Sequence, residues 1–409
     1  MDSAATTPAV NVGTKRWRYE VVGMIMMLAL GIIYGWSNFV KPIQAEMGWG
    51  ADNLALAYSI CTTMHCFGSL FGGWLCKKIN SRIVLITGMV VMCLGFIVSS
   101  VATSVAVLAL GYGFLVGGGA GMSYNSLLGI IVPWFPDKKG LASGLLFMSF
   151  GFCSMVFGTY AVPLIEAVGW RGAFRTVGLL YAGIVILCTL LIRPVGENDV
   201  LPPAVSAGGR KTNIVPMEIT GWKMIKRPTF ICFFFWGAFM CGCGLLMIGH
   251  ASPIAQEVGF SASAAALLTG VLTGFNGLGR VSFGAIADRK GTSLVMAIGS
   301  LLFVAGSLLM YASIRTGNIY IMIVAFVMMG FAYGSVTPTT TTVMSGFYGM
   351  QFYAINIGIA NLNVFPSSFG GPYISGILVE GSGSYASTAL FVCAMGAAAF
   401  TLSRFIRKP

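Results

Sequence analysis

Charged side chains are scarce in this sequence. Only 9% of its 409 residues are Asp, Glu, Lys or Arg, whereas 56% are hydrophobic. Because soluble domains carry about 25% charged residues, this composition excludes an ordinary soluble protein. Apolar runs of the length that crosses a bilayer as a helix, about 20 residues, recur along the whole chain. The composition therefore predicts an all-α, multi-pass protein embedded in a lipid bilayer.

Residues suited to acid–base or metal chemistry are equally few. The chain has two histidines and twelve acidic residues, and each acidic residue falls in a tail, a loop or a helix end. The ten cysteines form no Cys-x-x-Cys pair, and no histidines lie at metal-ligand spacing. These absences argue against an enzyme, a metal site or a bound cofactor. They also leave no buried carboxylate of the kind that drives many proton symporters.

Twelve apolar segments can be assigned by length and composition. We predict membrane helices over residues 19–40, 53–76, 82–104, 107–131, 141–164, 172–193, 229–250, 263–286, 292–313, 319–343, 353–378 and 385–405. The chain then divides into a tail (1–18), a six-helix bundle (19–193), a linker (194–228), a second six-helix bundle (229–405) and a final tail (406–409).

The basic residues predict the orientation in the membrane. The net charge is +12, and most of the 24 Lys and Arg residues fall in loops on the same side as the N-terminus. Loops rich in Lys and Arg stay in the cytoplasm, so we expect both termini there. We expect the protein itself to lie in the plasma (cytoplasmic) membrane. The positive charge is thus a topology signal and does not indicate nucleic-acid binding. We expect a monomer.

The chain contains an internal duplication. Residues 42–49 read Pro-Ile-Gln-Ala-Glu-Met-Gly-Trp, and residues 253–260 read Pro-Ile-Ala-Gln-Glu-Val-Gly-Phe, 211 positions later. The same offset relates Gly73 to Gly284 and His65 to Asn276. Two six-helix halves of this kind are typical of the parallel repeats in transporters, which places a binding site between the halves.

Arg280 lies inside the apolar segment 263–286. A guanidinium cannot discharge by losing a proton, and placing it at membrane depth costs a few kcal/mol. No acidic residue lies deep in any apolar segment, so we predict that the partner of Arg280 is a small organic anion. Asn276 precedes it by four residues on the same helix face. Asn276 either orients the guanidinium or the substrate, or makes a polar contact between helices.

A loop signature indicates the superfamily. Residues 284–291 read Gly-Ala-Ile-Ala-Asp-Arg-Lys-Gly and resemble the major facilitator superfamily (MFS) motif Gly-x-x-x-Asp-Arg-x-Gly. The resemblance implies the twelve-helix MFS fold of two pseudo-symmetric halves. It also implies that Gly284, Asp288, Arg289 and Gly291 make cytoplasmic contacts that break when the halves rock apart.

The copy of this loop in the first half is degenerate. Gly73 is retained, but Lys77, Lys78 and Asn80 replace the Asp, the Arg and the final Gly. Lys77 therefore stands where an acidic contact is expected, which leaves open how the outward-open state is held.

A narrower resemblance covers nearly the whole chain. Its motifs are Tyr34-Gly-Trp-Ser-Asn-Phe-Val-Lys-Pro, Trp134-Phe-Pro-Asp-Lys-Lys-Gly-Leu-Ala-Ser-Gly, Ile248-Gly-His-Ala-Ser-Pro and Asn276-x-x-x-Arg280. Together they resemble the oxalate/formate antiporter family, which is related to the monocarboxylate porters. The resemblance implies that the substrate is a small carboxylate bound by Arg280. It also implies that the cavity is lined by Tyr34, Tyr124, Phe150 and Tyr333.

One departure from the oxalate carrier bears on the substrate. That carrier has a lysine in helix 11, whereas residues 351–380 here contain no Lys or Arg, and Asn361 and Asn363 lie nearest the expected place. A single fixed positive charge favours a monoanion such as lactate, pyruvate or formate, because a dianion would leave net charge in an apolar cavity. Exchange of oxalate-like dicarboxylates is the alternative, and a non-transporting sensor with a transporter fold is a second one.

His250 is the remaining candidate, at the end of an apolar run before Pro253. Its imidazole either gates the outer cavity or binds a proton, or it is a hydrogen-bonded histidine at the membrane interface. His65 has weaker support for such a role. Two mechanisms stay open: exchange of carboxylates without a proton, and movement of a proton together with the substrate.

Overall fold

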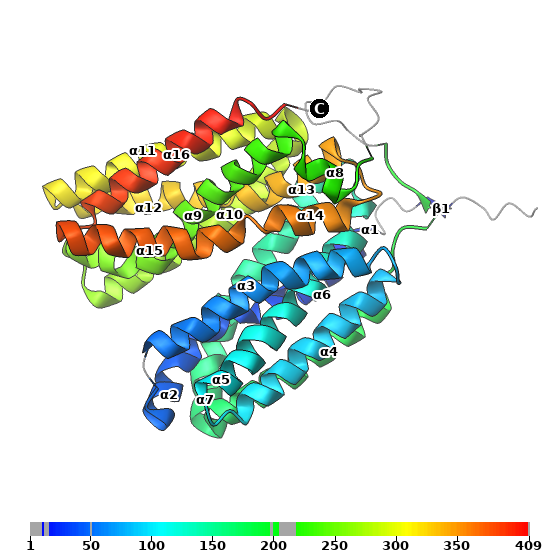
Figure 1. The fold of residues 1–409 in the computed structure, drawn as a ribbon, viewed down its shortest axis with the longest axis horizontal. Helices are drawn as coiled ribbons and strands as arrows, with labels where there is room; N and C mark the ends of the chain where they lie inside the picture. Colours follow the sequence, from blue (N-terminus) through cyan, green and yellow to red (C-terminus); the bar gives the residue numbers. More distant parts are fainter. Residues whose placement is uncertain (1–9, 12–15, 50, 197–198, 204–217, 408–409) are drawn as a thin grey trace, which may run out of the picture.

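The computed structural model describes residues 10–11, 16–49, 51–196, 199–203 and 218–407. Its helices follow the predicted apolar segments, because a helix satisfies every backbone N–H and C=O group that the bilayer core cannot. Two helical bundles lie side by side, meet at one end and diverge toward the other (Figure 1). The predicted all-α membrane architecture is confirmed.

The first bundle holds the segments predicted between residues 19 and 193. Its elements are α1 (Arg16–Leu30), η1 (Gly31–Trp36), α2 (Ser37–Met47), α3 (Ala51–Leu75), α4 (Ser81–Ser100), α5 (Val105–Leu108), η2 (Ala109–Val116), α6 (Gly117–Ile131), η3 (Val132–Trp134) and α7 (Lys139–Leu191). Two predicted helices form α7, which is interrupted at Gly169 (φ 69°, ψ 166°). This positive φ is accessible to glycine at little cost, which explains the residue at the break.

The second bundle holds the remaining segments. Its elements are α9 (Pro228–Glu257), α10 (Ala262–Lys290), α11 (Thr292–Thr316), α12 (Ile319–Tyr333), α13 (Val336–Phe347), α14 (Tyr353–Asn361), α15 (Val364–Ser382) and α16 (Ala386–Ser403). Two of the predicted spans are therefore discontinuous. One breaks at Gly334 and Ser335, and the other at Leu362 and Asn363. Breaks at these depths are typical of transporter helices that border a binding site.

The tail and the linker form structure that the sequence did not predict. Strand β1 (Val10–Asn11) pairs in parallel with β2 (Asp199–Val200), and α8 (Gly221–Ile225) lies within the predicted linker, of which residues 204–217 are outside the described part. The Asn356 amide donates to the Ile219 carbonyl at 3.1 Å, so the segment before α8 rests on α14. Strand β1 and helix α8 lie at the end where the bundles meet (Figure 1).

Seven helices within the described residues are long and apolar enough to cross a membrane by themselves. An eighth forms if residues 16–33 and 38–47, which meet at a 45° bend, make one span. Helix α10 is not among these, and it carries the polar Asn276 and Arg280 in its middle. Such a helix is stable in a membrane when its polar face points into the protein.

Glu20 corrects the expectation that no carboxylate is buried. Its side chain is only 1% exposed, and neither carboxylate oxygen has a hydrogen-bond partner among the described residues. The sequence placed Glu20 at the start of a span, but α1 already begins at Arg16, so Glu20 lies about one turn inside it. Helix α1 packs against α7 and α6 within the first bundle.

Candidate functional site

A cavity of about 600 Å³ lies between the two bundles. Five residues predicted from the sequence line it: Tyr124, Phe150, Arg280, Tyr333 and Asn361. Both broken spans of the second bundle reach it, because Tyr333 and Asn361 are the last residues of α12 and α14. The cavity is mostly apolar with few polar groups, which is the usual character of a small-molecule site.

Arg280 projects from α10 across the boundary between the bundles. Its side chain is 7% exposed. Its Nε donates to the Asn276 amide oxygen at 3.3 Å, and a terminal nitrogen donates to the main-chain carbonyl of Phe147 on α7. No carboxylate lies within 4.0 Å of its nitrogens among the described residues. Its partners are therefore neutral dipoles, and its positive charge remains uncompensated in the cavity wall.

Glycines hold α10 close to its neighbours at the level of Arg280. A Cβ atom added to Gly279 would lie 2.4 Å from the Phe331 carbonyl oxygen, and one added to Gly334 would lie 2.6 Å from the Arg280 amide nitrogen. These are backbone atoms, which cannot move aside as a flexible side chain does. Small residues at such contacts let membrane helices approach to backbone distance. The guanidinium is thus positioned by tight packing between α10 and the break that follows α12.

Aromatic rings from the first bundle form part of the cavity wall. The Tyr124 ring stacks on Phe147 with 5.7 Å between centroids and meets Phe150 edge-on at 5.3 Å. His65 on α3 approaches the Tyr124 ring edge-on at 5.2 Å and also lines the cavity. Sequence reasoning did not identify Phe147, because its contact with Arg280 uses a main-chain carbonyl that every residue type has. A backbone acceptor leaves no residue-type signal.

The other predicted binding residues lie elsewhere or are only partly described. The backbone of Tyr34 is in η1, while its side chain is outside the described part of the structure. His250 on α9 is not among the cavity-lining residues, and its Nδ1 lies 3.3 Å from the Tyr385 hydroxyl at the start of α16. Asn361 faces the cavity, whereas Asn363 is 3% exposed and packs against Gly237. Asn276 reaches the site through Arg280.

The signature loop lies where the bundles meet. The Asp288 carboxylate accepts hydrogen bonds from the Gly140 and Leu141 amides, each at 2.8 Å. These amides belong to the first turn of α7 in the other bundle, so Asp288 stabilises the positive end of that helix dipole. A Cβ atom added to Gly284 would lie 2.1 Å from the Gly140 carbonyl oxygen. Gly291 has φ 91° where α10 passes into α11, and Arg289 is exposed.

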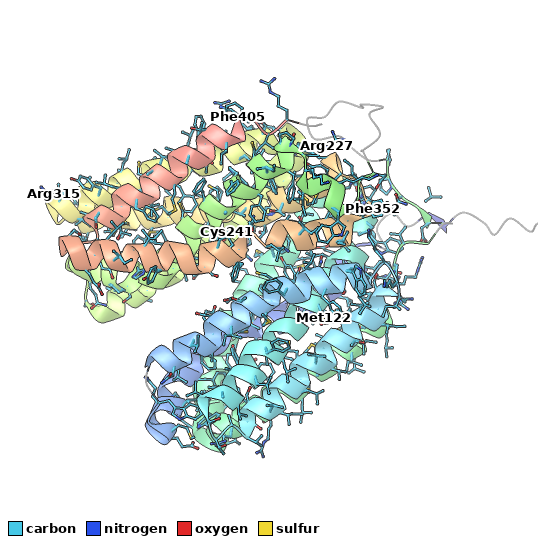
Figure 2. All side chains as sticks on the ribbon, in the orientation of Figure 1. Met122, Arg227, Cys241, Arg315, Phe352 and Phe405 are labelled. Atoms are coloured by element: carbon cyan, nitrogen blue, oxygen red, sulfur yellow. The ribbon has the colours of Figure 1, made fainter. Side chains whose placement is uncertain are left out.

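The degenerate loop of the first half makes a different contact. The Lys77 ammonium lies 3.7 Å from the centroid of the Phe352 ring, a cation–π geometry between the bundles. A Cβ atom added to Gly73 would lie 2.2 Å from the Ala354 carbonyl oxygen, so backbone contact is kept here too. Phe352 lies at the meeting end and Arg315 at the opposite end (Figure 2).

An acidic residue of the linker binds the turn that precedes α14. The Glu218 carboxylate accepts from the Met350 amide at 3.2 Å and from the Gln351 amide at 2.9 Å. These amides lie in the turn just before α14, which begins at Tyr353. Glu218 and α14 are parts of the same half, so this contact does not join the bundles. The turn before α14 is thus held by an acid from the linker, whereas the first turn of α7 binds Asp288 from the other bundle.

Acidification is expected to favour the closed arrangement in which Asp288 is buried. Burial raises the pKa of Asp288 to about 6 from its ordinary value of 3.8, while the Gly140 and Leu141 amides oppose the shift. When the bundles separate and the carboxyl is hydrated, its pKa falls back, so the closed end binds the proton more tightly. The closed population should therefore rise as the pH falls from about 7 to about 5.

The separation of the two bundles at this end can be measured with spin labels on the exposed residues Ile79 and Lys290, one on each bundle. The Asp288→Asn variant should lose the pH dependence. A closed fraction that falls with acidification in the unsubstituted protein would contradict the assignment.

Comparison with known proteins agrees with this architecture. The model of the Major Facilitator Superfamily matches residues 21–372 and 234–409. The chain is 26% identical over 306 residues to the oxalate:formate antiporter of Oxalobacter formigenes, covering 73% of this chain and 69% of that protein. It is 25% identical over 392 residues to monocarboxylate transporter 2 of Homo sapiens, covering 90% of this chain and 81% of that protein.

Solved structures share the fold at low sequence identity. The MFS transporter FucP in the outward conformation superposes with a TM-score of 0.73 at 14% identity, covering 95% of this chain and 99% of that one. The human organic anion transporter MFSD10 superposes with a TM-score of 0.70 at 14% identity, covering 95% of this chain and 99% of that one. The predicted twelve-helix, two-bundle fold is confirmed. The chain belongs to the Major Facilitator Superfamily, as a transporter related to the oxalate:formate antiporter and the monocarboxylate transporters.

Proposed function

We propose that this chain is a secondary active transporter of a small monocarboxylate, of the lactate, pyruvate or formate type, and that Arg280 binds the carboxylate. The observation that carries this proposal is the uncompensated guanidinium in the wall of the central cavity. Arg280 already has one nitrogen on Asn276 and one on Phe147. A guanidinium has five N–H donors, so further donors remain for a carboxylate, and the charge is neutralised when one binds.

The charge of the cavity favours a singly charged substrate. Arg280 is the one Lys or Arg among the residues that line the cavity in the described structure, and no Asp or Glu lines it. A monoanion brings the pair to neutrality, whereas a dianion leaves one negative charge in surroundings of low dielectric constant. The apolar and aromatic wall suits the short carbon chain of lactate or pyruvate. The names of the relatives, monocarboxylate transporters and an oxalate:formate antiporter, support this substrate class.

Alternating access would follow from the contacts between the bundles. With both termini and the linker in the cytoplasm, as the basic loops predict, the end closed by Asp288 and Gly284 faces the cytoplasm, and the conformation is outward-facing in the plasma membrane. Substrate would then enter from the outside, and the Asp288 bonds to α7 would break when the inner end opens. Rocking of two repeats about a central site is the common mechanism of such folds.

Counterflow in proteoliposomes tests the proposal. Vesicles loaded with unlabelled lactate, pyruvate, formate or oxalate should accumulate the corresponding labelled anion, with the monocarboxylates preferred. Measurements at two pH values show whether a proton accompanies the substrate. If oxalate alone is exchanged, the alternative of dicarboxylate antiport is correct. If no carboxylate is exchanged, Arg280 has another role and the proposed substrate class is wrong.

A further inference from the structure

His65 is the second basic residue in the wall of the central cavity. It stands on α3 in the first bundle, whereas Arg280 stands on α10 in the second, so the two border the cavity from opposite halves. The rings of Tyr124 and Phe147 connect them: Tyr124 touches the imidazole edge, and Phe147 stacks on Tyr124 and binds Arg280 through its carbonyl. His65 also occupies the position equivalent to Asn276 in the duplication.

The imidazole has an unused polar atom. Its Nδ1 is shielded from solvent and has no hydrogen-bond partner among the described residues. Buried polar atoms without partners are rare in folded proteins, and a catalytic role or a bound ion is a recognised reason for them. The two rings nearest to His65, those of Tyr124 and Phe150, present aromatic edges and faces that do not replace a ligand for this nitrogen.

The ionisable groups around His65 are few. Those that line the same cavity are Tyr58 and Cys66 on its own helix, Tyr124 on α6, Cys241 on α9, Arg280 on α10 and Tyr333 on α12. Tyrosine and cysteine are neutral near pH 7, and arginine keeps its charge. Within the described lining, His65 is thus the one group besides Arg280 that can carry a positive charge.

We propose that His65 is the second anion-binding group of the cavity and that its protonation admits a doubly charged carboxylate to the same site. This inference rests on the proposed function of Arg280. With neutral His65, one positive charge balances a monocarboxylate. With protonated His65, two positive charges on opposite halves balance a dicarboxylate such as oxalate. Two cations in an empty cavity repel each other, so the proton and the dianion bind together.

The coupling has a thermodynamic consequence that can be measured. If a proton on His65 strengthens binding of the dianion, the dianion must strengthen binding of the proton by the same factor. The relative affinity for a dicarboxylate over a monocarboxylate should therefore rise as the pH falls. The substrates themselves do not change charge in this range, because carboxyl groups titrate at about pH 4. The protein is then the source of the pH dependence.

The test is competition in counterflow assays at about pH 8 and about pH 6. The measured quantity is the ratio of the inhibition constants of lactate and oxalate against uptake of labelled lactate. In the unsubstituted protein the ratio of the inhibition constant of lactate to that of oxalate should rise by about tenfold or more on acidification, because oxalate binding requires the protonated imidazole, which becomes more populated as the pH falls. In His65→Gln, which keeps a polar side chain without a titrating group, the ratio should not change with pH.

The chain offers a matched control, because it has only two histidines. His250→Gln makes the same chemical change outside the cavity lining, and the shift of the ratio should persist in that variant. His65→Asn serves if His65→Gln does not fold, since asparagine occupies the equivalent position in the other half. A ratio that is flat in the unsubstituted protein, or a shift that survives in both His65 variants, overturns the proposal. Absence of any carboxylate exchange overturns the function of Arg280 and this inference with it, whereas a flat ratio with active lactate exchange overturns this inference alone.

Discussion

Replacing Arg280 with alanine is expected to abolish carboxylate uptake, by at least about a hundredfold. Removing one partner of a buried charge pair costs about 3–5 kcal/mol, and 1.4 kcal/mol corresponds to a factor of ten. In this protein the lost partner is the cavity's one fixed positive charge within the described lining. The Asn276 amide and the Phe147 carbonyl remain, but neither neutralises an anion. Initial rates of counterflow with labelled lactate, compared at equal protein content, measure the loss.

Arg280→Lys separates charge from geometry. Lysine keeps the positive charge but has no planar fork, so it cannot bind Asn276, Phe147 and a carboxylate in the same arrangement. We expect uptake to fall by about tenfold or more, with part of the activity retained, because bidentate recognition is lost while the attraction persists. Alanine and lysine variants that both transport at the original rate would show that the guanidinium has only a structural role.

Replacing Gly284 with alanine is expected to have the largest effect on the conformational cycle. The added Cβ would lie 2.1 Å from the Gly140 carbonyl oxygen and 2.7 Å from the Gly140 carbonyl carbon, so the two helices must move apart. Such overpacking costs about 1–3 kcal/mol, which shifts an equilibrium between two conformations by about 5- to 150-fold. Because the strain exists only in the closed arrangement, the variant should favour the state in which this end is open.

Gly270→Ala is the matched control on the same helix. An added Cβ at Gly270 has no neighbouring heavy atom within 4 Å, so the substitution changes helix propensity without a clash. Counterflow should fall by about tenfold in Gly284→Ala and remain near the original rate in Gly270→Ala. The distance between labels on Ile79 and Lys290 should lengthen only in the Gly284 variant. Equal behaviour of the two variants would show that the contact between Gly140 and Gly284 does not limit the cycle.

The positions of the membrane helices could be predicted from the sequence. The segments 53–76 and 292–313 correspond to Ala51–Leu75 and Thr292–Thr316, because a span needs a run of apolar residues that is local in the chain. Arg280 also stood out in the sequence, since a cation within an apolar run is visible without knowledge of its neighbours. The duplication and the loop at Asp288 were equally readable, because both depend on the order of residues alone.

The surroundings of these residues were decided by the tertiary structure. The Phe147 carbonyl that binds Arg280, the burial of Glu20 and the bonds of Glu218 to the turn before α14 all depend on segments far apart in the chain. A sequence states which residue types are present but not which helix faces meet. For the same reason the sequence ranked His250 above His65, although His65 lines the cavity and His250 does not.

The sequence by itself determined that the chain spans a membrane, that it consists of two related halves, and that one of its spans carries a permanent positive charge. Only the tertiary structure decided that His65 lines the cavity with Arg280 while His250 pairs with Tyr385 outside the lining. The physical reason is that spanning a bilayer depends on the hydrophobicity of one continuous segment. A binding site depends instead on which faces of separate helices pack against one another.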